Sequence, residues 1–168
     1  MGSAAFLSAH AFGPAEKVMD LGSGAGFPGI PLKILSPAMD LTLVEAREKK
    51  VGFLKHIIRL LKLSDTRCLH ARAEELARRE EMRGRFNLVT ARAAGQLESV
   101  LKAASPLISE GGLFITTKGP GYAARLNAAA GAVSRAGMEL LRVVSPSWEA
   151  GEGPYLLVFR KVPKKTFS

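Results

Sequence analysis

Short apolar runs alternate with amphipathic stretches along the whole chain. The apolar runs have the length of buried strands and fall at residues 18–21, 41–45, 66–69, 86–91, 113–117, 139–144 and 155–161. The spacing of apolar residues predicts helices at 31–35, 48–63, 96–104 and 122–135, with a further helix opening at 73–76. Strands that alternate with helices are typical of a parallel sheet covered on both faces. We therefore expect an α/β fold with a doubly wound, seven-stranded, Rossmann-like sheet.

The last two expected strands are joined by a short connection, residues 145–154, which contains Trp148. This connection is too short for a crossover helix, so the final pair of strands should be antiparallel. Such an ending is typical of methyltransferase-type sheets. A nicotinamide-binding Rossmann domain keeps the parallel crossover to its last strands.

The first expected strand ends in a glycine-rich turn. Asp20 closes the strand, and Gly22, Gly24 and Gly26 follow at alternate positions. Glycine lets a backbone turn sharply and approach a ligand closely, because it has no Cβ atom. A plain tight turn is the alternative interpretation, but we favour a cofactor-binding loop.

The spacing of these glycines helps to separate two cofactor classes. A nicotinamide site has Gly-x-Gly-x-x-Gly, whereas here the third glycine comes one residue early, and no phosphate-binding loop of the Gly-x-x-x-x-Gly-Lys-Ser/Thr type occurs. The Asp20 carboxylate would repel a pyrophosphate, but it could accept hydrogen bonds from a ribose or an ammonium group. Together with the antiparallel ending, this pattern favours S-adenosylmethionine over NAD.

Other strand ends carry further candidates, because ligands of doubly wound sheets bind at the carboxyl ends of the strands. Glu45 ends the second strand at the spacing of an acid that accepts hydrogen bonds from ribose hydroxyls; an exposed surface acid is the alternative. Ala73 and Glu74 follow the third strand and could border an adenine ring. Glu74 fits almost as well as an ordinary first-turn acid.

Two cations stand at the ends of the fourth and fifth strands. Arg92 lies among small residues, and its planar guanidinium could orient a carboxylate or a phosphate. Lys118 could neutralise an RNA phosphate or polarise a base carbonyl; a surface lysine at a turn is an equal alternative. We take both as candidate catalytic residues that act by positioning.

The helix expected at 48–63 has a basic face. Lys55, Arg59 and Lys62 follow one another at i, i+4 and i+7, so their side chains should project together and could contact RNA phosphates. A solvated surface stripe is an equal alternative.

Composition narrows the class of partner. The 168 residues suffice for a single domain, 1–168, whose basic end at 162–168 we expect to be a flexible tail. Lys and Arg outnumber Asp and Glu by 24 to 15, and this net charge of +9 predicts a polyanionic partner such as RNA. No apolar run of bilayer length and no signal-peptide pattern occurs, so we expect a cytoplasmic protein. One cysteine and three scattered histidines give no metal-ligand pattern.

At the level of motifs, the chain resembles the RsmG/GidB family over nearly its whole length. The resemblance lies in Asp20-x-Gly22-x-Gly24-x-Gly26-Phe27-Pro28-Gly29-Ile30-Pro31, Leu43-Val44-Glu45-Ala46, Lys49-Lys50-Val51-x-Phe53-Leu54, Ala71-Arg72-Ala73-Glu74-Glu75, Ala91-Arg92-Ala93 and Lys118-Gly119. It implies S-adenosylmethionine-dependent methylation of guanine N7 in the 16S RNA of the small ribosomal subunit. By motif, the implied cofactor-binding residues are Gly22, Phe27, Ala73, Glu74 and Arg92, and Glu45 matches the acid after the second strand.

Family members usually carry a helical N-terminal extension that ends in a His and an Asp-Ser pair. This chain begins shortly before the glycine strand, and residues 5–8 do not restore that pair. We expect cofactor binding without this extension, and we leave open whether RNA binding and full activity require it. We also expect the chain to act as a monomer.

The residues alone leave two other function classes open. A basic RNA-binding or ribosome-associated module could keep a non-catalytic cofactor fold. A methyltransferase of protein or of a small molecule would share every cofactor residue.

Overall fold

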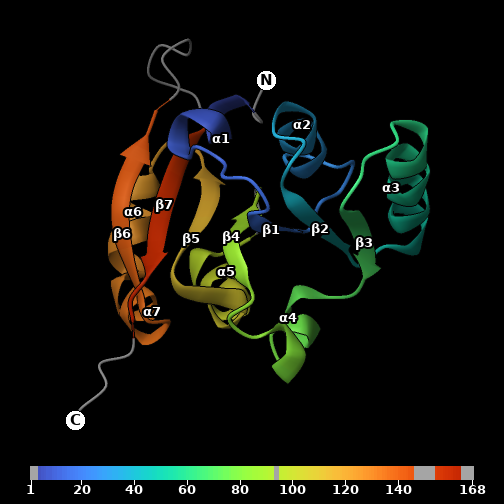
Figure 1. The fold of residues 1–168 in the computed structure, drawn as a ribbon. Helices are drawn as coiled ribbons and strands as arrows, with labels where there is room; N and C mark the ends of the chain where they lie inside the picture. The colour runs from blue at the N-terminus through green and yellow to red at the C-terminus, as the bar shows by residue number, and fades with distance from the viewer. Residues whose placement is uncertain (1–3, 93–94, 146–153, 164–168) are drawn as a thin grey trace.

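One seven-stranded sheet organises the protein (Figure 1), whose computed structural model describes residues 4–92, 95–145 and 154–163. Its strands are β1 (Lys17–Leu21), β2 (Asp40–Glu45), β3 (Thr66–His70), β4 (Phe86–Ala91), β5 (Ile108–Lys118), β6 (Met138–Val144) and β7 (Tyr155–Lys161). The strand order is β3-β2-β1-β4-β5-β7-β6. The first five strands are parallel, and β7 is antiparallel to both β5 and β6. The expected sheet and its antiparallel ending are thus confirmed.

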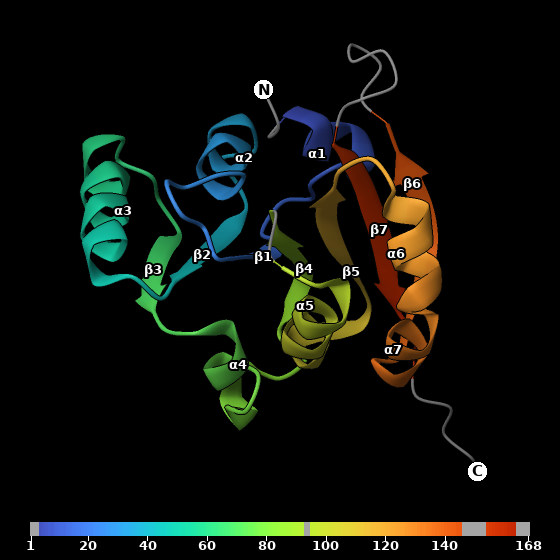
Figure 2. The same cartoon turned by 180° about the vertical axis from the view of Figure 1, so that it is seen from behind.

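Helices cover both faces of this sheet. They are α1 (Ala4–Ala9), α2 (Gly29–Leu35), α3 (Glu48–Leu60), α4 (Ala73–Leu76), α5 (Leu97–Ala104), α6 (Tyr122–Ala128) and α7 (Ala130–Arg135), with short 3-10 turns at Glu80–Met82 and Ser105–Leu107. In Figure 1, α1 lies in front of the sheet; in Figure 2, seen from behind, α5, α6 and α7 lie in front.

The inner strands of the sheet are apolar on both faces because each face has its own helix layer. Along β4, Leu88 packs into the core beneath α1, α2 and α3, while the next residue, Val89, packs into the core beneath α4, α5 and α7. Along β7, Val158 packs into the same core as Leu88, and Phe159 packs into the same core as Val89. Strands buried on both faces read as continuous apolar runs, which is why they could be found in the sequence.

Helix α3 is shorter than predicted. It ends at Leu60 instead of residue 63, and Lys62 adopts a left-handed conformation with φ of 49°. The Lys62 amide donates to the Arg59 carbonyl at 3.1 Å, and the Leu63 amide donates to the Ile58 carbonyl at 3.0 Å. This pair of bonds is a Schellman motif, a helix ending that usually uses glycine. The predicted basic face therefore keeps only Lys55 and Arg59 on the helix, and the placement of Lys62 on it was wrong.

Two further boundaries differ from the prediction. Strand β5 begins at Ile108 and not at residue 113, because the Gly111-Gly112 pair produces a register shift within the strand instead of a turn before it. The single helix expected at 122–135 is divided at Ala129 into α6 and α7. Helix α1 was not predicted.

Two predicted features fall on residues that the structure does not describe. The connection that contains Trp148 lies outside the described residues except for Ser145 and Pro154, and so does the expected tail beyond Pro163. Among the helices of the described part, none has both the length and the apolar character that a bilayer span requires.

The buried side chain of Leu88 should be a major source of stability. Leu88 is fully buried at the centre of the sheet, so Leu88→Ala should lower the free energy of unfolding by about 2–5 kcal/mol. Leu60→Ala is the matched control, because Leu60 is 63% exposed and its truncation should cost less than about 0.5 kcal/mol. Urea denaturation monitored by circular dichroism measures both values. Equal losses would contradict the described core.

Candidate functional site

The glycine turn after β1 has a backbone that only glycine adopts without strain. Gly22, Gly24 and Gly26 have φ angles of 67°, 59° and 93°. A Cβ atom on Gly26 would also lie 2.5 Å from Cδ1 of Ile30 on α2. At Gly26 the turn therefore packs directly against α2. At Gly22 an added Cβ would meet no atom within 4 Å, so the space beside this residue is open.

Beneath this turn lies the carboxylate of Asp20, which is fully buried. It accepts hydrogen bonds from the Thr90 hydroxyl at 2.9 Å and from the Gly29 amide, at the start of α2, at 3.2 Å. Burial raises the pKa of the Asp20 carboxyl from its ordinary value of 3.8 to about 6, and these hydrogen bonds offset part of that rise. Asp20 thus holds the turn from inside the protein.

Glu45 joins the end of β2 to the same turn. One carboxylate oxygen accepts from the Gly24 amide at 2.9 Å and the other from the Arg47 amide at 2.9 Å. Nearby, the Ser23 amide donates to the Val44 carbonyl at 2.9 Å. The Glu45 side chain is consequently held at the carboxyl end of β2, next to the glycines.

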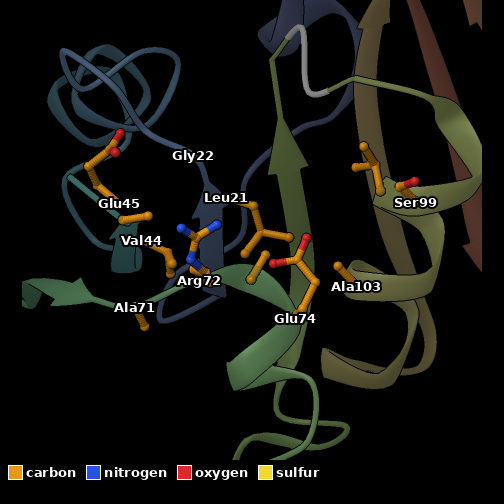
Figure 3. A pocket seen from close by; sticks show the side chains of 12 residues that line it. Leu21, Gly22, Val44, Glu45, Ala71, Arg72, Glu74, Ser99 and Ala103 are labelled. Carbon is orange, nitrogen blue, oxygen red and sulfur yellow. The ribbon is translucent and has the colours of Figure 1, made fainter.

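A cavity of about 270 Å³ opens at this edge, next to the point where the strand order reverses between β1 and β4. Four predicted cofactor residues line it: Gly22, Glu45, Ala73 and Glu74. Its volume is near the lower end of ligand-binding cavities, about 300 Å³. Figure 3 shows Glu45 on one side of the cavity and Glu74 on the other.

Sequence reasoning missed two polar residues of this cavity. Arg72 comes from the connection between β3 and α4, and Ser99 comes from the first turn of α5. In Figure 3, Arg72 lies between the two carboxylates, and Ser99 lies beyond Glu74. Arg72 directly precedes the assigned pair Ala73 and Glu74, and Ser99 belongs to the helix that follows β4. Both residues follow soon after the carboxyl end of a strand, so their positions in the sequence could have marked them as candidates.

Arg92 and Phe27 lie together outside the walls of this cavity. The Arg92 guanidinium stands over the Phe27 ring, 5.5 Å from its centroid, and Phe27 is 43% exposed. A cation above an aromatic face is attracted by the ring quadrupole, so this contact restrains Arg92 at the surface of the turn.

Lys118 is buried, unlike the surface lysine that was its alternative interpretation. It is 8% exposed, and its ammonium group donates to the Gly95 carbonyl at 2.8 Å. Burial lowers the pKa of Lys118, and the charge of Arg125 lowers it further. Lys55 and Arg59 are exposed on α3. Nowhere in residues 4–92, 95–145 or 154–163 do three His, Cys, Asp or Glu side chains gather as metal ligands would.

Comparison with protein families gives one match that covers most of the chain. The GidB family model, described as rRNA small subunit methyltransferase G, matches residues 3–150. A protein of this name from Clostridium botulinum (strain Loch Maree) is 34% identical over 160 residues, which cover 95% of this chain and 67% of the relative. Another, from Caldanaerobacter subterraneus, is 49% identical over 104 residues, which cover 62% of this chain and 44% of the relative.

Solved structures with the same fold are more distant in sequence. A SAM-dependent methyltransferase from Aquifex aeolicus has a TM-score of 0.71 at 14% identity, covering 96% of this chain and 90% of that one. The [4+2]-cyclase SpnF has a TM-score of 0.75 at 14% identity, covering 95% and 79%. Since one of these proteins is a cyclase by name, the fold alone does not determine the reaction.

Burial of Asp20 should make stability depend on pH. Because the pKa of Asp20 is higher in the folded chain than in the unfolded chain, its ionisation should destabilise the fold as the pH rises through about 4 to 6. Replacement of Asp20 by Asn removes this titration. Between pH 4 and pH 7, the free energy of unfolding of the native chain should fall relative to that of Asp20→Asn by about 2 kcal/mol.

Urea denaturation of both proteins at each pH measures this difference, and the other titrating groups cancel in the comparison. A difference that stays constant with pH would show that Asp20 titrates as it does in the unfolded chain.

Proposed function

This chain belongs to the rRNA small subunit methyltransferase G family, and on that premise we propose that it is an S-adenosylmethionine-dependent methyltransferase that methylates guanine N7 in 16S ribosomal RNA. The observation that carries the proposal is the convergence of Gly22, Glu45 and Glu74 on one cavity at the carboxyl edge of the sheet. Gly22 and Glu74 are 52 positions apart in the chain, with Glu45 between them, yet all three residues face the same space.

The cavity suits the adenosine part of this cofactor. A Cβ on Gly22 would stand in open space at the cavity wall, so the absence of a side chain leaves room for a bound molecule. Glu45 offers carboxylate oxygens to ribose hydroxyls, and the small or apolar residues Ala71, Ala73 and Val100 offer contacts to a flat ring. Asp20 supports the turn from below without leaving the core.

Methyl transfer to N7 makes modest demands on the chain. When bound, S-adenosylmethionine supplies an electrophilic methyl group on its sulfonium. Guanine N7 has an in-plane lone pair and no proton, so no residue has to serve as a general base. The residues contribute by alignment, which can lower a barrier by about 7–11 kcal/mol.

Cations must stay away from N7, because methylation there creates a positive charge. We therefore assign Arg92 and Lys118 to a carboxylate, a phosphate or the guanine O6 atom. The Phe27 ring restrains Arg92 and the Gly95 carbonyl restrains Lys118, which limits the motion of both cations. In this proposal both act as positioning groups.

The partner that we propose is the small ribosomal subunit or its RNA. The net charge of +9 favours attraction to a polyanion, and Lys55, Arg59 and Lys118 are the proposed phosphate contacts. We place the activity in the cytoplasm, where ribosomal RNA is modified. A monomer should suffice, because one chain contributes all the residues named above.

Two measurements test the proposed function directly. Calorimetry with S-adenosylmethionine should give one site per chain, and transfer of a tritiated methyl group to unmodified small ribosomal subunits should label 16S RNA at a guanine N7. Nucleotide mapping identifies the labelled position. Comparison of naked RNA with assembled subunits shows which of them is the substrate.

The outcomes separate this proposal from its alternatives. Absence of cofactor binding would contradict the enzyme and favour an RNA-binding module. Cofactor binding with methyl transfer to protein or to a small molecule, but not to RNA, would contradict the substrate assignment.

The role of Glu45 can be tested with a single charge change. Glu45→Gln should weaken S-adenosylmethionine binding by about 10- to 100-fold, because it removes a charged acceptor for the ribose hydroxyls. Glu48→Gln is the matched control, since Glu48 is exposed on the first turn of α3 and should leave the affinity unchanged. Calorimetry measures both affinities. An equal affinity for the two variants would remove Glu45 from the cofactor site.

A further inference from the structure

A second cavity lies on the other side of the first turn of α5. It has a volume of about 340 Å³ and is bordered by α5, the end of β5 and α6. Ser99 and Val100 of α5 face the first cavity, whereas Gln96 and Glu98 face the second one. Figure 2 shows α5 and α6 on the same face of the sheet, on either side of β5.

Two cations, Lys118 and Arg125, line this second cavity. The same two residues also border a smaller hollow of about 300 Å³ that reaches Thr117 and Gly119. Lys118 and Arg125 therefore line both hollows at the carboxyl end of β5.

Neither cation is paired with an acid among the described residues. The ammonium group of Lys118 bonds to the Gly95 carbonyl, and the ion pairs of the described chain do not include Arg125. Glu98, the acid on the cavity wall, is bound by Arg135 at 3.1 Å. Burial lowers the pKa of Lys118 most, and the positive charge of Arg125 lowers it further, because the two cations repel each other. An anion between them would remove that repulsion.

Local packing holds Arg125 near Lys118. The Tyr122 ring, at the start of α6, packs against the Tyr155 ring with 4.4 Å between the centroids. Tyr155 pairs with Lys118 across the β5–β7 ladder. Arg125 lies three residues after Tyr122, so it projects from nearly the same side of α6, one turn further along.

We propose that Arg125 and Lys118 together bind a phosphodiester group of the substrate RNA next to the methylated guanine. A guanidinium fork and an ammonium point charge are the donors that recognise phosphate oxygens. The site lies on the other side of the first turn of α5 from the cofactor cavity and shares no lining residue with it. This inference rests on the proposed function only in that RNA is the substrate.

The test compares RNA binding by Arg125→Ala and Arg83→Ala. Both variants lose one positive charge. Arg83, however, is exposed just before the amino-terminal end of β4, whereas Lys118 and Arg125 lie at the carboxyl end of the strands. Fluorescence anisotropy with unmodified 16S RNA transcript, at several salt concentrations, gives the affinity and its salt dependence. For Arg125→Ala we expect about tenfold weaker binding and a salt slope reduced by about one.

Arg125→Lys should recover part of the affinity, and Arg83→Ala should bind as the native chain does. Calorimetry should show the same affinity for S-adenosylmethionine in Arg125→Ala and the native chain. Equal RNA affinities and salt slopes for Arg125→Ala and Arg83→Ala would overturn the proposal. So would binding of inorganic phosphate as tight as that of RNA, since it would assign the cavity to a free anion.

This readout is independent of methyl transfer. If the chain transfers no methyl group but the loss of Arg125 still weakens RNA binding as described, the phosphate site stands and the proposed enzyme fails. If the chain methylates RNA and the loss of Arg125 has no effect on RNA affinity, the enzyme stands and the phosphate site fails.

Discussion

The carboxylate of Asp20 lies where three elements meet: the end of β1, the Thr90 hydroxyl on β4 and the first amide of α2. A carboxylate that is fully buried loses its hydration, and hydrogen bonds from neighbouring groups must compensate for that loss. Those bonds add to the backbone pairing of β1 with β4, the strands at which the order reverses, and connect both strands to the start of α2. A Cβ on Gly29 would lie 3.0 Å from the same carboxylate, so the start of α2 must be glycine for the helix to come this close. The glycine turn and the cavity beside it depend on this junction.

Strands β1, β2, β4 and β7 could be predicted closely because most of their residues are buried on both faces of the sheet. The bounds of β4 and β7 agree with the sequence prediction, and those of β1 and β2 differ by one residue. The sequence also predicted that Gly22, Glu45 and Glu74 lie near one another, because the carboxyl ends of parallel strands meet at one edge of the sheet. For these residues, topology alone determines which of them come together.

The features that escaped prediction depend on local geometry or on packing between distant segments. Lys62 occupies the left-handed position that ends α3, although glycine is the usual residue at such a position. The Gly111-Gly112 pair bends a strand instead of ending it, because hydrogen bonds to β4 continue on both sides. Helix α1 packs through Phe6 into a core formed by residues far along the chain. Arg72 reaches the cavity only through the fold of its connection. None of these has a periodic signal in the sequence.

The distribution of charge around α5 connects the two cavities to the chemistry of a methyl transfer. The first cavity carries Glu45 and Glu74, with Arg72 between them, and so provides carboxylates on the side where a cationic sulfonium cofactor would bind. Lys118 and Arg125 are on the other side of the α5 turn. A methyl donor is positively charged, and so is guanine after methylation at N7, so cations next to the reacting atoms would oppose both binding and reaction. On the proposed function, the first turn of α5 would separate Lys118 and Arg125 from the methyl group, so these two cations could attract a polyanionic substrate without opposing the transfer.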